Sequence, residues 1–262
     1  MRNTEPNISV LHHNFVSILG TQQLAMLPNY LVIDTETTGF SSAKDRIWQI
    51  GVFVMHEGQP LYEHGKSFWL QTDEQILQKA SFEINRRTGR SNPSRKEGFT
   101  KDAVFYQARD TFIDAVRQQG VDRRAAFKVL VDTVNAYCAQ RSMIVGQNIT
   151  QFDSKFLVAE YERLGIPFAI DYERVLDVGI LFKAAILERR KTERETTKQF
   201  IFRVAEERAK GVKWSVERLT EHYQLAEKYG VDPANAHDAG TDCWITHLAL
   251  REMLLSAMEG EA

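Results

Sequence analysis

The chain has 262 residues, of which 43% are hydrophobic and 26% are charged, and its net charge at pH 7 is −2. This is ordinary globular composition. The nearly neutral charge argues weakly against a protein that coats a nucleic-acid duplex, because such proteins neutralise many phosphates with Lys and Arg.

The chain has only two cysteines, Cys138 and Cys243, and both fall in segments predicted to be helical. Two are too few for a disulfide framework or a zinc cluster, and reduced thiols suit a cytosolic compartment. No uninterrupted apolar run reaches about 18 residues, and polar residues break the N-terminal stretch. We therefore expect a cytoplasmic protein that does not enter a membrane.

The N-terminal part of the chain predicts one helix and three strands. Within residues 1–28, apolar residues from Val10 to Leu19 recur at helical spacing and predict a short amphipathic helix packed on the domain. Apolar runs then predict strands at 31–33, 46–55 and 61–70. Because short turns join the three strands, they form an antiparallel meander.

The rest of the chain predicts two more strands among helices. Residues 71–101 are less regular, and 86–101 form a basic loop rich in Gly, Ser and Pro. The order of elements predicts an α/β fold with a five-stranded mixed sheet in a single domain, 29–262. The later elements are helices at 102–118, 122–139 and 153–164, strands at 142–146 and 174–178, an extended helix over the charged stretch 187–213, and helices at 214–223 and 239–256.

The most informative motif is Asp34-Thr35-Glu36, which ends the first buried strand. Residues i and i+2 of a strand point to the same face, so the two carboxylates project together. Two close like charges are costly unless a cation neutralises them, and hard oxygen ligands suit Mg²⁺ or Mn²⁺. Taken alone, the motif is better explained by two exposed acids at a strand end.

Two further motifs carry acids at the starts of helices. In the segment from Gln147 to Asp153, the final aspartate follows an apolar strand and opens a helix, where it could simply cap the helix N-terminus. In His237-Asp238-Ala239-Gly240-Thr241-Asp242, His237 falls on the loop before the closing helix and Asp242 in its first turns. A histidine beside a metal-bound water would be a general base near neutral pH.

These three motifs together resemble those of the DEDDh exonucleases, the DnaQ-like proofreading family. The resemblance rests on LVIDTETTGF (31–40), IVGQNITQFD (144–153) and HDAGTD (237–242), which occur in the family's order and in the expected strand or helix context. It implies a ribonuclease-H-like fold whose first three strands are antiparallel, with metals at the end of the central strand.

The resemblance also implies a mechanism. Asp34, Glu36, Asp153 and Asp242 would hold two divalent cations, Mg²⁺ or Mn²⁺, and His237 would be the general base. The reaction would be 3′→5′ hydrolysis of terminal phosphodiester bonds of DNA, which releases nucleoside 5′-monophosphates. Thr35, Thr37, Thr38, Gln147, Asn148 and Phe152 would line the substrate site.

Several points stay open at this stage. Gln147 stands where this family often has His, which puts a phosphate contact there in doubt. Gln49 stands where Glu is common, and we expect little effect from that difference. Phe82 and Ile84 could contact a base or belong to the core. The loop 86–101 could hold the strand or be an ordinary surface loop.

The partner implied is a nucleic acid with a free 3′ end, and a polymerase or another replication or repair protein is a further candidate. An exoribonuclease or oligonucleotide-trimming enzyme with the same chemistry is the first alternative, because a metal site does not read the sugar. An inactive nucleic-acid-binding or scaffold module is the second. The sequence does not predict the oligomeric state.

Overall fold

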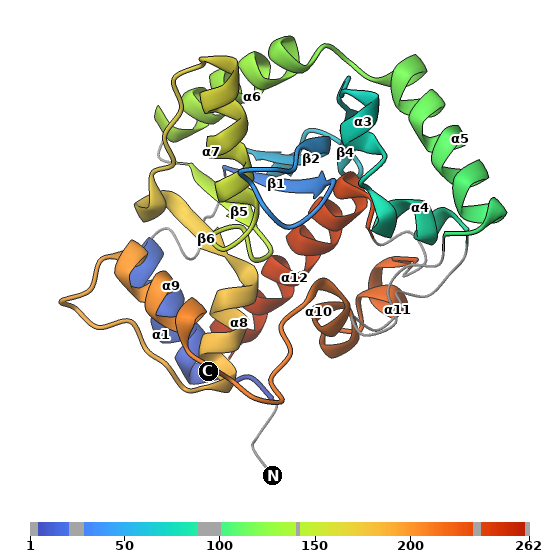
Figure 1. Cartoon of the computed structure of the whole chain (residues 1–262). Coiled ribbons are helices and arrows are strands. Elements are labelled where there is room, and N and C mark those ends of the chain that lie inside the picture. The colour runs from blue at the N-terminus through green and yellow to red at the C-terminus, as the bar shows by residue number, and fades with distance from the viewer. Residues whose placement is uncertain (1–4, 21–28, 89–100, 140–141, 233–236, 260–262) are drawn as a thin grey trace.

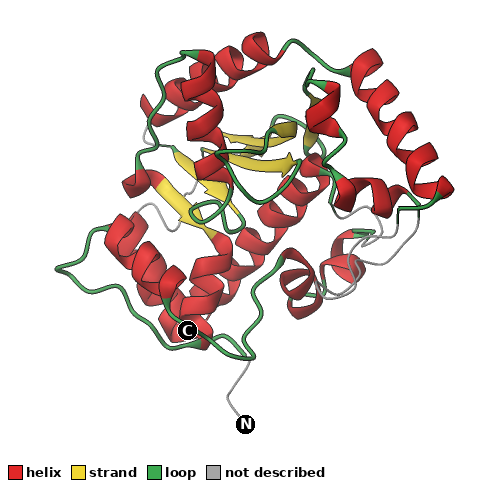
Figure 2. Cartoon of the chain, viewed as in Figure 1, coloured by secondary structure: helices red, strands yellow, loops and turns green. Residues whose placement is uncertain are grey.

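The protein is described by a computed structural model covering residues 5–20, 29–88, 101–139, 142–232 and 237–259. Its centre is a six-stranded mixed sheet with helices on both faces (Figures 1 and 2). The strands lie in the order β3-β2-β1-β5-β6, and β4 pairs with β2. They are β1 (Tyr30–Thr37), β2 (Ile47–His56), β3 (Gln59–Pro60), β4 (Lys66–Trp69), β5 (Met143–Gly146) and β6 (Val175–Asp177).

The strand directions confirm the α/β class and the mixed sheet. β1 pairs antiparallel with β2 and parallel with β5, and β5 pairs parallel with β6. The strand count differs from the prediction because the expected third strand, 61–70, is shortened to β4, and a separate two-residue strand, β3, precedes it. β3 and β4 both pair with β2, and residues 61–65 between them are not strand.

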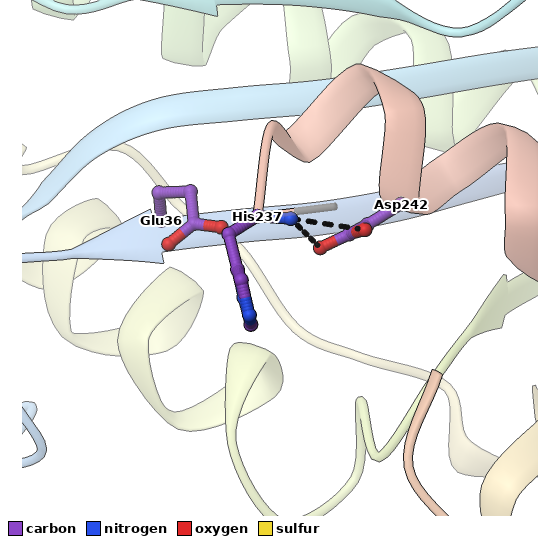
Figure 3. Close-up of side chains that lie close together, drawn as sticks. All are labelled: Glu36, His237 and Asp242. Atoms are coloured by element: carbon purple, nitrogen blue, oxygen red, sulfur yellow. Dashed lines mark hydrogen bonds between the residues drawn. The ribbon is translucent and has the colours of Figure 1, made fainter. Parts of the chain in front are cut away.

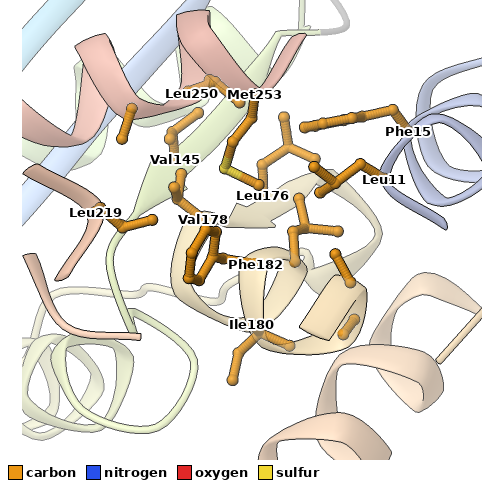
Figure 4. Packing of buried hydrophobic residues seen from close by; sticks show 14 of the residues in the cluster. Leu11, Phe15, Val145, Leu176, Val178, Ile180, Phe182, Leu219, Leu250 and Met253 are labelled. Carbon is orange, nitrogen blue, oxygen red and sulfur yellow. The ribbon is translucent and has the colours of Figure 1, made fainter. Parts of the chain in front are cut away.

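Two groups of helices cover the sheet. Buried side chains of α6 and α7 pack on one face, and those of α1, α8 and α12 pack on the other, where Leu11, Phe182 and Met253 meet (Figure 4). A smaller cluster joins α4 and α5 to Trp48 of β2. The helices are α1 (Ile8–Leu19), α3 (Glu74–Leu77), α4 (Ser81–Arg87), α5 (Ala103–Gln119), α6 (Arg123–Ala139), α7 (Asp153–Leu164), α8 (Val178–Ile186), α9 (Thr197–Glu206), α10 (Val216–His222), α11 (Leu225–Tyr229) and α12 (Ala239–Glu259).

The N-terminal segment contributes a helix to this core. The structure has α1 within the stretch where an amphipathic helix is predicted, and Leu11 and Phe15 are fully buried against α8 and α12. The buried Asn14 ties α1 to the turn after α8, since its side chain donates to the Arg189 carbonyl and accepts from the Lys191 amide.

The charged stretch 187–213 was predicted to be one extended helix, but only α9 within it is helical. Thr196 starts α9 with a capping box, and the preceding turn contains Glu188 at a positive φ of 55°. The sequence also did not predict α8, whose nine residues are all buried, because a helix buried on every side has no polar face to mark its period.

The basic loop 86–101 lies mostly outside the described residues. Its first two members are in α4, where Arg86 and Arg87 both bind the buried Glu83 carboxylate. Ile84 is fully buried in the core, and the Phe82 and Cys138 side chains lie outside the described residues. No helix in the described ranges is long and apolar enough to cross a bilayer.

Candidate active site

The carboxyl end of the central strand β1 carries the first two acids. Leu31, Val32 and Ile33 are buried between the two helix layers, and the strand then ends in polar residues. Asp34 and Glu36 are half-buried, and Asp34 lies opposite Gly51 of β2. A Cβ at Gly51 would lie 2.0 Å from the Ala239 carbonyl oxygen, so the glycine lets the start of α12 approach β1.

Asp153, the first residue of α7, reaches β1 from the other side. Its Oδ1 accepts hydrogen bonds from the Thr35 amide at 2.9 Å and the Thr35 hydroxyl at 2.6 Å. The loop before it is fixed by Asp177, a fully buried residue whose carboxylate accepts from the amides of Asn148, Thr150 and Ile180. This arrangement places the buried Asp153 carboxylate beside the acids of β1.

The start of α12 brings the third segment to the same place. The Asp242 carboxylate lies 3.2 and 3.3 Å from the backbone N–H of His237, which donates to it (Figure 3). His237 has a positive φ of 69°, and its Nε2 lies 3.7 Å from Glu217 Oε1. Ligand atoms of Glu36, His237 and Asp242 all lie within 4.8 Å of one another, close enough to hold one metal ion.

A polar network anchors this turn to the sheet. The buried Gln49 side chain donates to Asp238 Oδ2 at 2.6 Å and accepts from the Ala239 amide at 3.2 Å. Ser67 of β4 donates to Asp238 Oδ1 and accepts from the Gly240 amide. β2 and β4 therefore fix where α12 begins, and with it the positions of His237 and Asp242.

The four acids and His237 share one cavity of about 600 Å³. All five predicted catalytic residues line it, and so do Thr35, Gln147, Asn148 and Phe152 of the predicted substrate contacts. The other members of the lining are Phe40, Val212, Lys213, Trp214, Ser215, Val216 and Glu217.

Burial and mutual repulsion disfavour the charged forms of these acids. Burial raises the pKa of Asp34 and of Glu36 well above the usual range, and nearby carboxylates raise both further. Burial also raises the pKa of Asp153 and of Asp242 to about 7. A cation between the carboxylates would favour their charged forms and offset this cost.

Two predicted substrate residues lie outside the cavity lining. The Thr37 hydroxyl donates to the Gly39 carbonyl at 2.6 Å, and the Thr38 Oγ1 accepts from the Arg46 amide. Both bonds close the β1–β2 loop, so these threonines shape the loop instead of facing the cavity. Gln147 lines the cavity, but its Nε2 donates to the Trp214 carbonyl and so fixes the opposite wall.

Several contributors were not singled out from the sequence. Asp177 and Asp238 organise the two loops, although a polar residue just before a helix is a recognisable capping signal. Residues 212–217, which form one wall of the cavity, carry no local motif. Their position depends on α8, which was not predicted, and on α9, which was expected to be part of a longer helix.

Comparison with known proteins finds similarity at the level of the fold. No family model and no curated protein matches the chain. A structure of exonuclease I covers 86% of this chain and 40% of its own, at 18% identity and a TM-score of 0.56. E. coli exonuclease I in complex with a dT13 oligonucleotide covers 89% and 42%, at 17% identity and a TM-score of 0.56.

A third match is the zinc-ion-bound form of the E. coli exonuclease I complex with single-stranded DNA. It covers 88% of this chain and 41% of its own, at 17% identity and a TM-score of 0.51. The chain thus spans about two fifths of the length of these exonuclease I chains. At such low identity the likeness concerns the fold, which is the ribonuclease-H-like α/β fold of these exonucleases.

Proposed function

We propose that this protein is a metal-dependent 3′→5′ exonuclease that removes single nucleotides from a nucleic-acid end. The observation that carries the proposal is the meeting of four carboxylates from three distant segments in one cavity, with a histidine beside them. They are Asp34 and Glu36 from β1, Asp153 from α7 and Asp242 from α12. Structural support alone does not require such a costly arrangement of like charges.

The donor set fits divalent metal ions. All four acids offer hard oxygen ligands, and Glu36, His237 and Asp242 already have ligand atoms within 4.8 Å of one another. Because Thr35 occupies Oδ1 of Asp153, the remaining oxygen of that carboxylate is the one free to bind a metal. Two bound ions, Mg²⁺ or Mn²⁺, would supply Lewis-acid stabilisation of the scissile phosphate and a water of lowered pKa.

His237 is the group proposed to take the proton of the attacking water. Its ring lines the cavity, and its backbone N–H is held by the Asp242 carboxylate. Glu217, 3.7 Å from Nε2, would stabilise the imidazolium that forms. The proton then leaves toward solvent, since the side chain of His237 is 41% exposed.

The fold neighbours support a nuclease that acts on single strands. Solved complexes of E. coli exonuclease I contain dT13 or single-stranded DNA, and one form is zinc-bound. In this chain Phe40 is 85% exposed and lines the same cavity, with its ring beside that of Phe152. Exposed aromatic rings suit unpaired bases, because stacking is available only when a base is not in a duplex.

The experiment uses single-stranded DNA, duplex DNA and RNA of one sequence, each labelled at the 5′ end. Each is incubated with Mg²⁺, Mn²⁺ or EDTA. We expect laddered shortening from the 3′ end with release of 5′-monophosphates, and no cleavage in EDTA. Faster cleavage of RNA than of DNA would favour the exoribonuclease alternative.

A pair of variants controls this experiment. Asp34→Ala removes a proposed metal ligand, whereas Asp110→Ala removes an exposed acid on α5, outside the cavity. We expect Asp34→Ala to abolish shortening and Asp110→Ala to retain it. Equal cleavage in EDTA, or by Asp34→Ala, would contradict the metal mechanism. Metal binding without cleavage of any substrate would favour the inactive binding module.

A further inference from the structure

The loop between α9 and α10, residues 207–215, carries three exposed cations, and its last part lines the candidate active site. They are Arg208, Lys210 and Lys213, and Lys213 belongs to the cavity lining. No ion pair joins Arg208 or Lys210 to an acid in the part of the chain that the structure describes. Glu207, the one acid in the loop, binds Arg189 instead.

Buried contacts fix this loop at both ends. Lys183 of α8 is buried, and its ammonium donates to the carbonyls of Ala205 at 3.1 Å and Glu207 at 2.8 Å. The same ammonium lies 4.3 Å from the centre of the Trp214 ring. Gln147 donates to the Trp214 carbonyl from the other side. The last part of the loop, from Val212 to Ser215, is therefore a preformed wall of the cavity.

A tight turn directs the cations outward. The Val212 amide donates to the Ala209 carbonyl at 3.1 Å, and Gly211 has a φ of 85°, which a side chain would disfavour. Val212 is consequently buried in the main core, and the neighbouring Lys210 and Lys213 are exposed. The turn keeps Val212 in the core and Lys213 at the cavity edge, while Arg208 and Lys210 are exposed on the residues that lead up to it.

The charge of this wall contrasts with that of the cavity floor, where Asp34, Glu36, Asp153 and Asp242 gather. A strand whose terminal phosphodiester reaches those acids must lead its remaining phosphates out past the cavity walls. We propose that Arg208, Lys210 and Lys213 form a backbone track that binds the phosphates on the 5′ side of the scissile bond. This inference rests on the proposed function and assigns the strand path to one wall.

The dimensions suit several phosphates. Arg208 and Lys213 are five positions apart, and the turn between them keeps their Cα atoms within about 15 Å of each other. Phosphates follow one another every 3.4 Å or so along a stacked strand, so that each cation can meet a different phosphate. Three contacts on a single strand correspond to a slope of about −2 in a plot of log affinity against log salt.

The test compares Arg208→Ser/Lys210→Ser/Lys213→Ser with a control that loses the same charge elsewhere, Lys79→Ser/Arg109→Ser/Lys128→Ser. KM is measured for single strands of 2, 4, 8 and 12 nucleotides at several NaCl concentrations. We expect the track variant to raise KM for the 12-mer about 10-fold. We also expect its plot of log affinity against log salt to be less steep than that of wild type, by about 2. The dinucleotide KM of Arg208→Ser/Lys210→Ser, which keeps the cavity-lining Lys213, should stay at the wild-type value, as should every KM of the control variant.

Two results would overturn the track. One is a 12-mer KM and salt slope equal to wild type. The other is an equal rise in KM for the dinucleotide and the 12-mer, which would place the effect of the substitutions at the reaction centre. Failure of the proposed function is distinguishable, because then no variant cleaves any strand. In that case the affinity for the 12-mer is measured by fluorescence anisotropy in EDTA. Equal affinities of the wild type and the track variant would reject the track.

Discussion

The Thr35 amide and hydroxyl both donate to Oδ1 of Asp153, although the two residues are 118 positions apart in the chain. The pair joins the central strand to the first turn of α7 and places Asp153 beside Asp34 and Glu36. Thr35 was predicted to contact the terminal nucleotide, and it does line the cavity. Its hydrogen bonds indicate a second role, which is to orient Asp153, one of the proposed metal ligands.

Thr35→Val should therefore weaken catalysis. The amide bond to Asp153 remains, but the charge-assisted hydroxyl bond, worth about 1.5–3 kcal/mol, is lost. We expect kcat/KM to fall about 10- to 100-fold, with weaker Mn²⁺ binding. Thr35→Ser keeps the hydroxyl and should stay within a few-fold of wild type. Equal activity of the Val and Ser variants would show that the hydroxyl does not position Asp153.

Asp34→Asn should stabilise the metal-free protein. Burial and the carboxylates of Asp153, Asp242 and Glu36 all raise the pKa of Asp34, so its charged form opposes folding. In EDTA at pH 8 we expect Tm to rise by about 2–4 °C for each kcal/mol by which the free energy of unfolding increases. Mn²⁺ should stabilise wild type more than the variant. A lower Tm for Asp34→Asn in EDTA would show that the acids are not in mutual repulsion.

His237→Ala should separate catalysis from metal binding. Loss of a general base lowers the rate about 10²–10⁴-fold, whereas the four carboxylates remain to bind metal. Single-turnover cleavage and Mn²⁺ titration measure the two effects. His12→Ala, on α1 and bonded to the Ala257 carbonyl, is the matched control and should cleave normally. A normal rate for His237→Ala would assign His237 a structural role.

The buried His247 should make the free energy of unfolding depend on pH. It is buried on α12, its Nδ1 lies 2.6 Å from the Tyr30 hydroxyl, and burial lowers its pKa from 6.5 to about 4. The unfolded chain therefore binds more protons than the folded one between these values, so stability is present above pH 6.5 and is lost as pH falls toward 4. The full loss is about 3 kcal/mol.

Denaturant unfolding at pH 7 and pH 4.5 measures this loss, with His247→Asn as the comparison. The variant cannot take up the proton, so its stability should change less between the two pH values. An identical pH dependence of wild type and variant would mean that His247 is not a buried neutral group.

The sequence predicted most of the central sheet and the residues that meet in the cavity. The three motifs lie at strand ends and helix starts, where period and capping signals are strong, and Asp34, Asp153 and Asp242 came together as expected. Thr37 and Thr38 lie outside the cavity lining, because their side chains make hydrogen bonds within the β1–β2 loop that a linear motif does not reveal.

Other parts of the site depend on contacts between distant segments. Gln49, at a position where the family that the sequence resembles often has Glu, was expected to have little effect. In the structure its amide donates to Asp238, so Gln suits a site where Glu would face another carboxylate. The wall at 212–217 likewise depends on Lys183 of α8, in a helix without a polar face to reveal it.

The carboxylates of Asp34, Glu36, Asp153 and Asp242 are proposed to bind divalent cations together. The most direct measurement is anomalous diffraction from crystals of the protein grown with Mn²⁺ and a nucleoside 5′-monophosphate. We predict manganese peaks among these four carboxylates, with the phosphate bound against them. Manganese bound only elsewhere, with the cavity carboxylates free of metal at saturating Mn²⁺, would contradict the account.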